Sequence, residues 1–163
     1  MNPRILFALG LAACVPSLQA GFEQELTDDG GCGDVVFYAH DDVDTVMLTL
    51  YAEGLVGEAT DAGVASDFDF TLPDDGVELI VEVGSKISDA TCDDVIENGG
   101  PRVRETWTAT AGTASITILP GETEWDAHGS MHLESVEFEN EGGATVTLPS
   151  FDIEDVAVGW LAG

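Results

Sequence analysis

Short segments in which apolar and polar residues alternate are the feature that most constrains how this chain folds. In residues 67–72 every second residue is apolar, and residues 77–83 alternate in the same way. A period of two is typical of strands with one buried face, because successive side chains of a strand point to opposite sides. Between the two segments lies Pro-Asp-Asp-Gly, residues 73–76, in which proline presets φ and glycine permits a positive φ. The pattern predicts two strands joined by a tight turn.

The same alternation recurs along most of the chain. No segment shows a convincing long helical period, and residues 53–66 suit either a loop or a short, weak helix. In residues 130–139 the alternation changes phase, which indicates a β-bulge near Glu134 and Ser135. We predict an all-β domain, an antiparallel β-sandwich of about eight to ten short strands, with a related barrel as the other option. The expected strands are residues 34–40, 45–52, 67–72, 77–83, 102–111, 113–119, 130–139, 144–148 and 151–160.

The N-terminus has the layout of a secretory leader. A short segment with one positive charge, Arg4, precedes an apolar and small-residue run over residues 5–15. The run is too short for a membrane-spanning helix, which needs about 20 residues, but it suits the apolar part of a signal peptide. Leu-Ala-Ala-Cys at residues 11–14 resembles the lipobox of bacterial lipoproteins, which implies lipidation of Cys14. Cleavage after Ala20 is the alternative.

These signals divide the chain into three parts. We expect residues 1–20 to be the leader, residues 21–31 to be an acidic, glycine-rich tether, and residues 32–163 to be the β-sandwich domain. The tether has few apolar anchors, so we expect it to lie loosely at the surface. The protein is expected to be exported, either lipid-anchored in the cell envelope or secreted.

Two cysteines, Cys32 and Cys92, remain once the leader is set aside. The chain has no Cys-x-x-Cys, and no Cys/His spacing suits zinc. We expect a disulfide between these cysteines rather than two free buried thiols, because disulfides persist in exported proteins. The bond would close a loop of about 60 residues and stabilise the fold by roughly 4 kcal/mol in the chain-entropy model.

Acidic residues dominate the charge of the chain. There are 32 Asp and Glu against four Lys and Arg, for a formal net charge of −28. This composition excludes a nucleic-acid partner, because such binding depends on Lys and Arg that neutralise phosphates. It also repels anionic lipid headgroups, so membrane attachment is expected only through the lipid anchor. The acidic surface suits either salty surroundings, which screen self-repulsion, or divalent cations.

Calcium is the cofactor that the composition admits, since Ca²⁺ takes about six to eight oxygen ligands. Acidic residues gather at the expected turns, and we take Asp41, Asp42 and Asp44 as candidate calcium ligands, with solvated turn charges as the alternative. His128 and His132 have the i, i+4 spacing that suits two metal ligands on a helix. On a strand the two lie about 13 Å apart, so we expect surface histidines and no transition-metal site.

Catalytic motifs of the nucleophile-elbow, phosphate-loop and metalloprotease types do not occur in the sequence. Carboxylate pairs of the kind that glycosidases use are too abundant here for any one pair to be informative. Aromatic residues that could contact a ligand are Trp107, Trp125, Trp160, Tyr38 and Tyr51. Trp107 and Trp160 lie in expected strands and should be buried. Trp125 lies in a polar loop and is the candidate ligand contact, for example for a sugar, unless it folds onto the edge of the sandwich.

The second half of the chain carries Ala-Gly-Thr at residues 111–113, Ile-Thr-Ile at 116–118, a strand led by Gly129, Thr-Val-Thr at 145–147 and a closing Phe151. In this order these elements resemble small secreted bacterial lipoproteins, and the resemblance implies the sandwich fold alone. We predict a non-catalytic, exported, lipid-anchored surface protein whose partner is an unidentified protein or glycan. The alternatives are a calcium-stabilised module that binds a ligand such as carbohydrate, and a hydrolase that uses an acidic pair.

Overall fold

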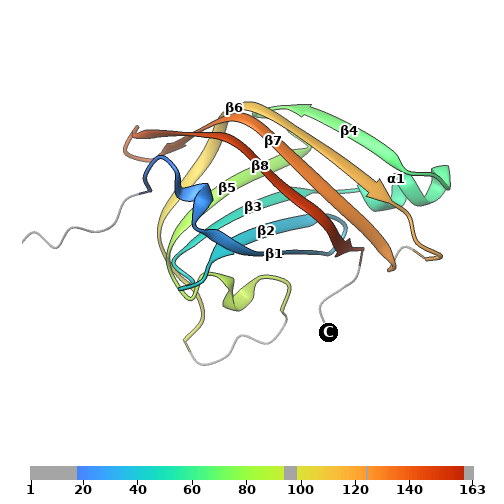
Figure 1. The fold of residues 1–163 in the computed structure, drawn as a ribbon, viewed down its shortest axis with the longest axis horizontal. Coiled ribbons are helices and arrows are strands. Elements are labelled where there is room, and N and C mark those ends of the chain that lie inside the picture. Colours follow the sequence, from blue (N-terminus) through green and yellow to red (C-terminus); the bar gives the residue numbers. More distant parts are fainter. Residues whose placement is uncertain (1–17, 94–98, 124, 160–163) are drawn as a thin grey trace, which may run out of the picture.

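Eight strands form one antiparallel sheet in the computed structural model, which describes residues 18–93, 99–123 and 125–159 (Figure 1). Hydrogen-bonded neighbours follow the order β1-β2-β3-β5-β6-β7-β8, and β4 pairs with β6. The antiparallel all-β class predicted from the sequence is confirmed. The elements are η1 (Phe22–Gln24), β1 (Leu26–Cys32), β2 (Val36–Asp41), β3 (Val46–Ala52), α1 (Leu55–Ala62), β4 (Ser66–Thr71), β5 (Val77–Ser85), η2 (Ser88–Ala90), β6 (Arg102–Leu119), β7 (Ala127–Asn140) and β8 (Thr145–Val158).

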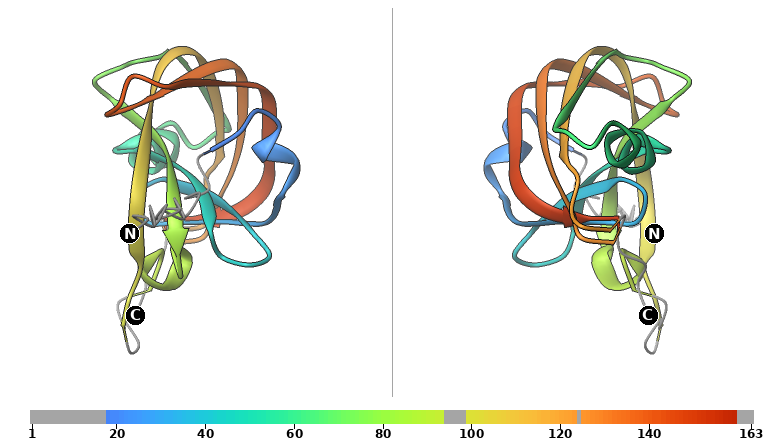
Figure 2. Two further views of the ribbon diagram at one scale, coloured as in Figure 1. Left: turned by 90° about the vertical axis from the view of Figure 1, so that its left-hand side faces the viewer. Right: turned by 90° about the vertical axis from the view of Figure 1, so that its right-hand side faces the viewer.

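The sheet curves until its two end strands, β1 and β8, lie side by side (Figure 2). Gly31 lies at this contact: a Cβ atom there would be 2.9 Å from both Val156 Cγ2 and the Ala157 carbonyl oxygen. Just beyond β1, the carbonyl oxygen of Gly33 accepts a hydrogen bond of 2.5 Å from the Gly159 N–H. The missing side chain at Gly31 therefore allows the sheet to come close to closing on itself.

Two irregularities let the long strands β6, β7 and β8 bend over the core. Ser135 in β7 has a φ of 53°, and Gly112 in the facing part of β6 has a φ of 118°. A Cβ atom at Gly112 would lie 2.6 Å from Val136 Cα, so this crossing requires glycine. The bulge predicted near Glu134 and Ser135 is confirmed. A second register shift, where Asp155 of β8 has a φ of 53°, explains why the apolar pattern changes phase there.

The inner side of the sheet encloses an apolar core. Along β5 and β8 buried residues alternate with more exposed ones, as the sequence pattern predicted. Large side chains fill the core, among them Phe37, Trp107 and Phe138, which are almost completely buried. Burial of Trp107 agrees with its prediction as a core residue.

Residues between β3 and β4, for which a loop or a short helix was expected, form the helix α1. Gly54 and Gly63 flank the helix in the left-handed conformation, and the Gly63 N–H donates to the Ala59 carbonyl oxygen at 2.9 Å. A left-handed glycine is a common end to a helix because it has no Cβ to clash. Leu55 and Val56 are buried in the core, so α1 covers the core where β3 gives way to β4 (Figure 1).

The structure differs from the tether predicted for residues 21–31. Residues 26–32 form β1, which pairs with β2 along most of its length. Phe22 is buried, and its ring meets the Phe138 ring edge-on with centroids 6.2 Å apart. Even Leu18, within the expected leader, is only 7% exposed and belongs to the core. A tether was expected because β1 lacks apolar alternation, but a strand pairs through its backbone and needs none.

Candidate functional site

A gap in strand pairing opens a groove on the outer face of the sheet. The same edge of β6 pairs with β5 along residues 102–108 and with β4 along residues 113–118. Between these stretches the chain turns through residues 72–76, and the Leu72 N–H donates to the Gly112 carbonyl oxygen at 2.9 Å. The first residues of β5 therefore diverge from β6.

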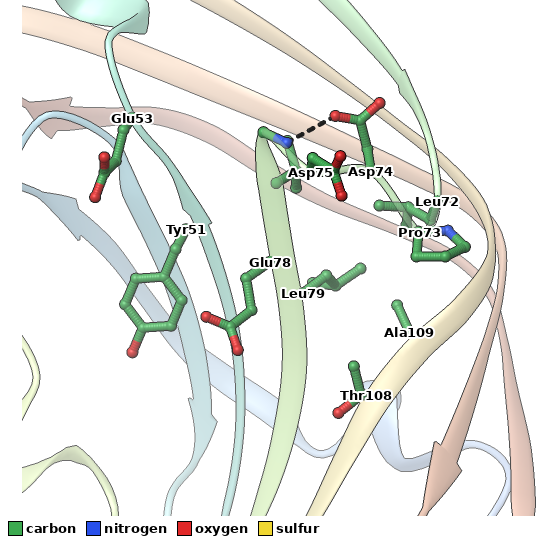
Figure 3. A pocket seen from close by; sticks show the side chains of 12 residues that line it. Tyr51, Glu53, Leu72, Pro73, Asp74, Asp75, Glu78, Leu79, Thr108 and Ala109 are labelled. Carbon is green, nitrogen blue, oxygen red and sulfur yellow. Dashed lines mark hydrogen bonds between the residues drawn. The ribbon is translucent and has the colours of Figure 1, made fainter.

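This opening, which we call the β4–β5 groove, has a volume of about 530 Å³. Its floor includes the buried apolar side chains of Leu72, Leu79 and Ala109. Figure 3 shows Tyr51 and Glu78, which are cross-strand partners on β3 and β5, lying near each other at its side. Other carboxylates of the lining are those of Glu53, Asp74 and Asp75. An apolar floor under a polar rim is the arrangement of a small-ligand site.

The turn predicted from Pro-Asp-Asp-Gly forms one wall of the groove. Asp74 Oδ1 accepts a hydrogen bond of 2.9 Å from the Gly76 N–H, which is the local bond by which aspartate stabilises turns. Asp75 is exposed and has no hydrogen bond within the described ranges. The turn therefore exposes the Asp75 carboxylate, which does not take part in holding the turn together.

Tyr51 stands between the β4–β5 groove and a second cavity. Its side chain lines both, and the residue is 38% exposed. Burial raises the pKa of Tyr51, the Glu82 and Glu78 carboxylates raise it further, and the neighbouring Thr49 hydroxyl lowers it by hydrogen bonding. Burial also raises the pKa of Glu82. Tyr51 therefore lies in a negative and partly desolvated environment.

The second cavity, of about 240 Å³, lies beneath the connection from β5 to β6. Cys92 in that connection forms a disulfide with Cys32 at the end of β1, with Cα atoms 5.8 Å apart, which confirms the predicted bond. Met47 and Ile87 are buried in this region, and the Thr91 hydroxyl donates to Met47 Sδ at 3.4 Å. The disulfide therefore holds the connection against the outer face of β3.

Asp41, the first predicted calcium ligand, caps the turn between β2 and β3. It is 4% exposed, and its carboxylate accepts hydrogen bonds from the Thr45 N–H (2.6 Å), the Thr45 hydroxyl (2.6 Å) and the Val46 N–H (2.9 Å). Burial alone would raise the pKa of Asp41, but these hydrogen bonds outweigh it and the pKa is lowered. Protein donors therefore already occupy most of the acceptor sites of this carboxylate.

The other two predicted calcium ligands do not face Asp41 as a set. Asp44 Oδ1 accepts a hydrogen bond of 2.9 Å from the Ser88 N–H, which ties the turn to η2, and Asp42 is exposed. Among the described residues, no three His, Cys, Asp or Glu side chains are grouped so that they could hold a metal ion. Calcium binding at this turn stays a prediction.

The two histidines of β7 lie apart on the outer face, each beside an aspartate of β8. His128 Nδ1 is 2.9 Å from Asp155 Oδ1, and His132 Nδ1 is 2.6 Å from Asp152 Oδ1. Their position as surface residues of a strand agrees with the sequence prediction.

Trp125, the predicted ligand contact, is 50% exposed in the connection between β6 and β7. Cys14 and Trp160 lie outside the described residues.

The sequence named some of the groove residues but did not bring them together. Tyr51 was among the candidate aromatics, and Asp74 and Asp75 were turn acids, whereas Glu78 and Glu82 looked like ordinary polar positions of an alternating strand. The signal that joins them is strand register: Tyr51 pairs with Glu78 across β3 and β5. Register could not be deduced from alternation alone.

No protein-family model, curated protein or solved structure matches the chain. In the ranges that the structure describes, no helix is long and apolar enough to cross a membrane.

Proposed function

We propose that this protein is a non-catalytic, exported module of the cell envelope, anchored by a lipid on Cys14, that binds a ligand in the β4–β5 groove. Within this proposal the bent strands β6 to β8 fold one half of the sheet over the other, so that the two halves pack face to face as in the predicted β-sandwich. The leader supports export, and the absence of catalytic motifs from the sequence supports a binding role.

The burial of Leu18 is the observation that carries the anchoring proposal. Cleavage after Ala20 would remove Leu18 from the core, whereas processing at Cys14 would leave it in the mature chain. Leu18 belongs to the core cluster, and the Gln19 carbonyl oxygen accepts a hydrogen bond of 3.2 Å from the Phe22 N–H. Complete burial of a leucine side chain contributes about 1.5–3 kcal/mol. Lipidation at Cys14 is the processing route that keeps this contribution.

Two measurements test the anchoring proposal. The intact mass of the mature protein should correspond to an acylated N-terminal Cys14, and a mass that begins at Gly21 would overturn the proposal. In the purified mature chain, Leu18→Ala should lower the free energy of unfolding by about 2–3 kcal/mol, while Gln19→Ala, at an exposed neighbour, should leave it within about 0.5 kcal/mol. If both changes lower the free energy of unfolding equally, the burial of Leu18 does not support the anchoring proposal.

The β4–β5 groove supports the binding role because it joins an apolar floor to unsatisfied carboxylates and a half-exposed aromatic ring. A screen of oligosaccharides and small polar compounds, followed by two-dimensional NMR, should find ligands that shift the amides of residues 72–79. Tyr51→Leu should raise the ligand concentration at which those shifts appear. If every ligand found shifts amides elsewhere, the groove is not the binding site.

A second candidate, the calcium-stabilised carbohydrate module, is favoured by the exposure of Trp125. The ring is half exposed, and Glu122 and Asp126, both exposed, lie nearby in sequence. An exposed aromatic face beside hydrogen-bonding carboxylates suits a sugar ring. Oligosaccharide binding should then be lost in Trp125→Ala, and millimolar calcium should raise the melting temperature more than sodium does at matched ionic strength. If the two salts raise the melting temperature equally, calcium acts only by screening the negative charges.

A further inference from the structure

We propose that the ligand recognised at Tyr51 is an organic cation, a protonated amine or guanidinium carried on an apolar stem. The cation would lie against the Tyr51 ring between Glu78 and Glu82, and its stem would lie on the floor of the β4–β5 groove. This inference rests on the proposed function and names the class of ligand for the same groove.

The charged side chains that line the two cavities beside Tyr51 are all acidic. Neither cavity that Tyr51 separates has a Lys or Arg in its lining, within the part of the chain that the structure describes. Glu78 and Glu82 lie close enough to Tyr51 to raise its pKa, and burial raises the pKa of Glu82 itself. Among the described residues, no Lys or Arg forms an ion pair with Glu82. Lys86, the nearest lysine in sequence, pairs with Asp89 instead. A partly buried carboxylate without a partner is costly, and a bound cation relieves that cost.

The Tyr51 ring supplies a contact beyond charge. The face of an aromatic ring attracts a cation within about 6 Å of its centre, and desolvation strengthens the attraction. Thr49 projects from the same face of β3 as Met47 and Tyr51, and both of these line the second cavity. Thr49 itself is completely buried and is not part of either lining, and its hydroxyl lies close enough to Tyr51 to lower the pKa of Tyr51.

The arrangement of the carboxylates favours an organic cation over a metal ion. Glu53, Asp74 and Glu78 lie around the rim of a groove of about 530 Å³, and no three acids of the described chain converge on one point. A compact ion such as Ca²⁺ requires converging oxygens. A guanidinium or an extended amine distributes several donors over a wider area, and its carbon stem suits the apolar floor of Leu72, Leu79 and Ala109.

Isothermal titration calorimetry of the mature protein tests this assignment with three probes: arginine amide, spermidine and a penta-arginine peptide. The buffer contains about 0.15 M salt, at which the Debye length of about 8 Å screens remote carboxylates. Tyr51→Phe keeps the ring and should bind within about twofold of wild type. Tyr51→Leu should weaken binding roughly three- to thirtyfold. Glu78→Gln and Glu82→Gln should each weaken it about two- to fivefold.

Glu134→Gln and Glu154→Gln serve as matched controls, because both residues are exposed and neither lines the groove. They should change binding less than about twofold. Equal losses in control and groove variants, or equal binding by Tyr51→Phe and Tyr51→Leu, would overturn the proposal and leave only diffuse attraction to an acidic protein. Thermal melts of each variant establish that it is folded.

The probes also separate the sources of the cation. Groove-dependent binding of spermidine or arginine amide supports a free amine as ligand, and groove-dependent binding of the peptide alone supports a basic segment of a protein. If oligosaccharides bind the groove and none of the cations does, the cation assignment fails while the proposed function stands. If no compound of either kind shifts the amides of residues 72–79, both fail.

Discussion

Replacement of Asp41 by alanine is the sharpest test of how the β2–β3 turn is held. The buried carboxylate accepts three hydrogen bonds, two from Thr45 and one from Val46. Hydrogen bonds to a charged group contribute about 1.5–3 kcal/mol each, but three that share one carboxylate do not add independently. We expect Asp41→Ala to lower the free energy of unfolding by about 3 kcal/mol, which corresponds to a fall in melting temperature of about 6–12 °C.

The matched control is Asp42→Ala at the exposed neighbouring position, which should change the free energy of unfolding by less than about 0.5 kcal/mol. Urea denaturation followed by circular dichroism measures both variants. If Asp41→Ala is as stable as Asp42→Ala, the three hydrogen bonds do not hold the turn. If instead calcium stabilises the wild type but neither variant, Asp41 and Asp42 act as metal ligands, as the sequence predicted.

The pH dependence of Asp41 gives an independent check. Its pKa in the folded protein is lowered from the ordinary value of 3.8. A group whose pKa is lower in the folded state stabilises the fold above its unfolded pKa, and this stabilisation is lost as the pH falls through the folded value. The stability difference between wild type and Asp41→Asn should therefore be constant above about pH 5 and shrink below about pH 3.8. A difference that grows on acidification would contradict the assignment.

Other structural features make further predictions. Replacing Cys32 and Cys92 by alanine should cost roughly 4 kcal/mol in urea denaturation, and a much smaller loss would mean that the unfolded chain is already compact. Gly31→Ala should lower the melting temperature because its Cβ would meet β8, whereas Gly57→Ala, in open space on α1, should raise it through a gain in helix propensity of up to about 1 kcal/mol. Equal effects of the two glycine changes would contradict close packing of β1 against β8. Ser135→Gly should stabilise the fold by about 1 kcal/mol by relieving a left-handed φ of 53°, and a loss would show that the serine side chain holds the bulge.

The features that local pattern encodes were predictable. Alternation placed β4 and β5 with the turn between them, and a break in alternation placed the bulge at Ser135. Composition singled out Cys32 and Cys92 as the only cysteines outside the leader, so their pairing followed once export was inferred. In each case the information lies within a few residues or in a simple count, and no knowledge of strand order is needed.

Tertiary structure alone decided the features that depend on which segments meet. Residues 26–32 form a strand because β2 offers a backbone to pair with and Gly31 lets β8 approach, although their side chains show no alternation. Asp41 became a buried turn cap because Thr45 and Val46 fold back onto it, whereas in the sequence it is one acid among many.

The groove has the same origin. Tyr51 and Glu78 are far apart in sequence and become neighbours only through the register of β3 and β5, and the space beside them opens because β4 displaces β5 along β6. The period of a strand determines which face a residue occupies but not which strand lies next to it. The sequence by itself therefore determined the alternating strands, the disulfide and the sign of the surface charge, and strand register decided where a binding site could form.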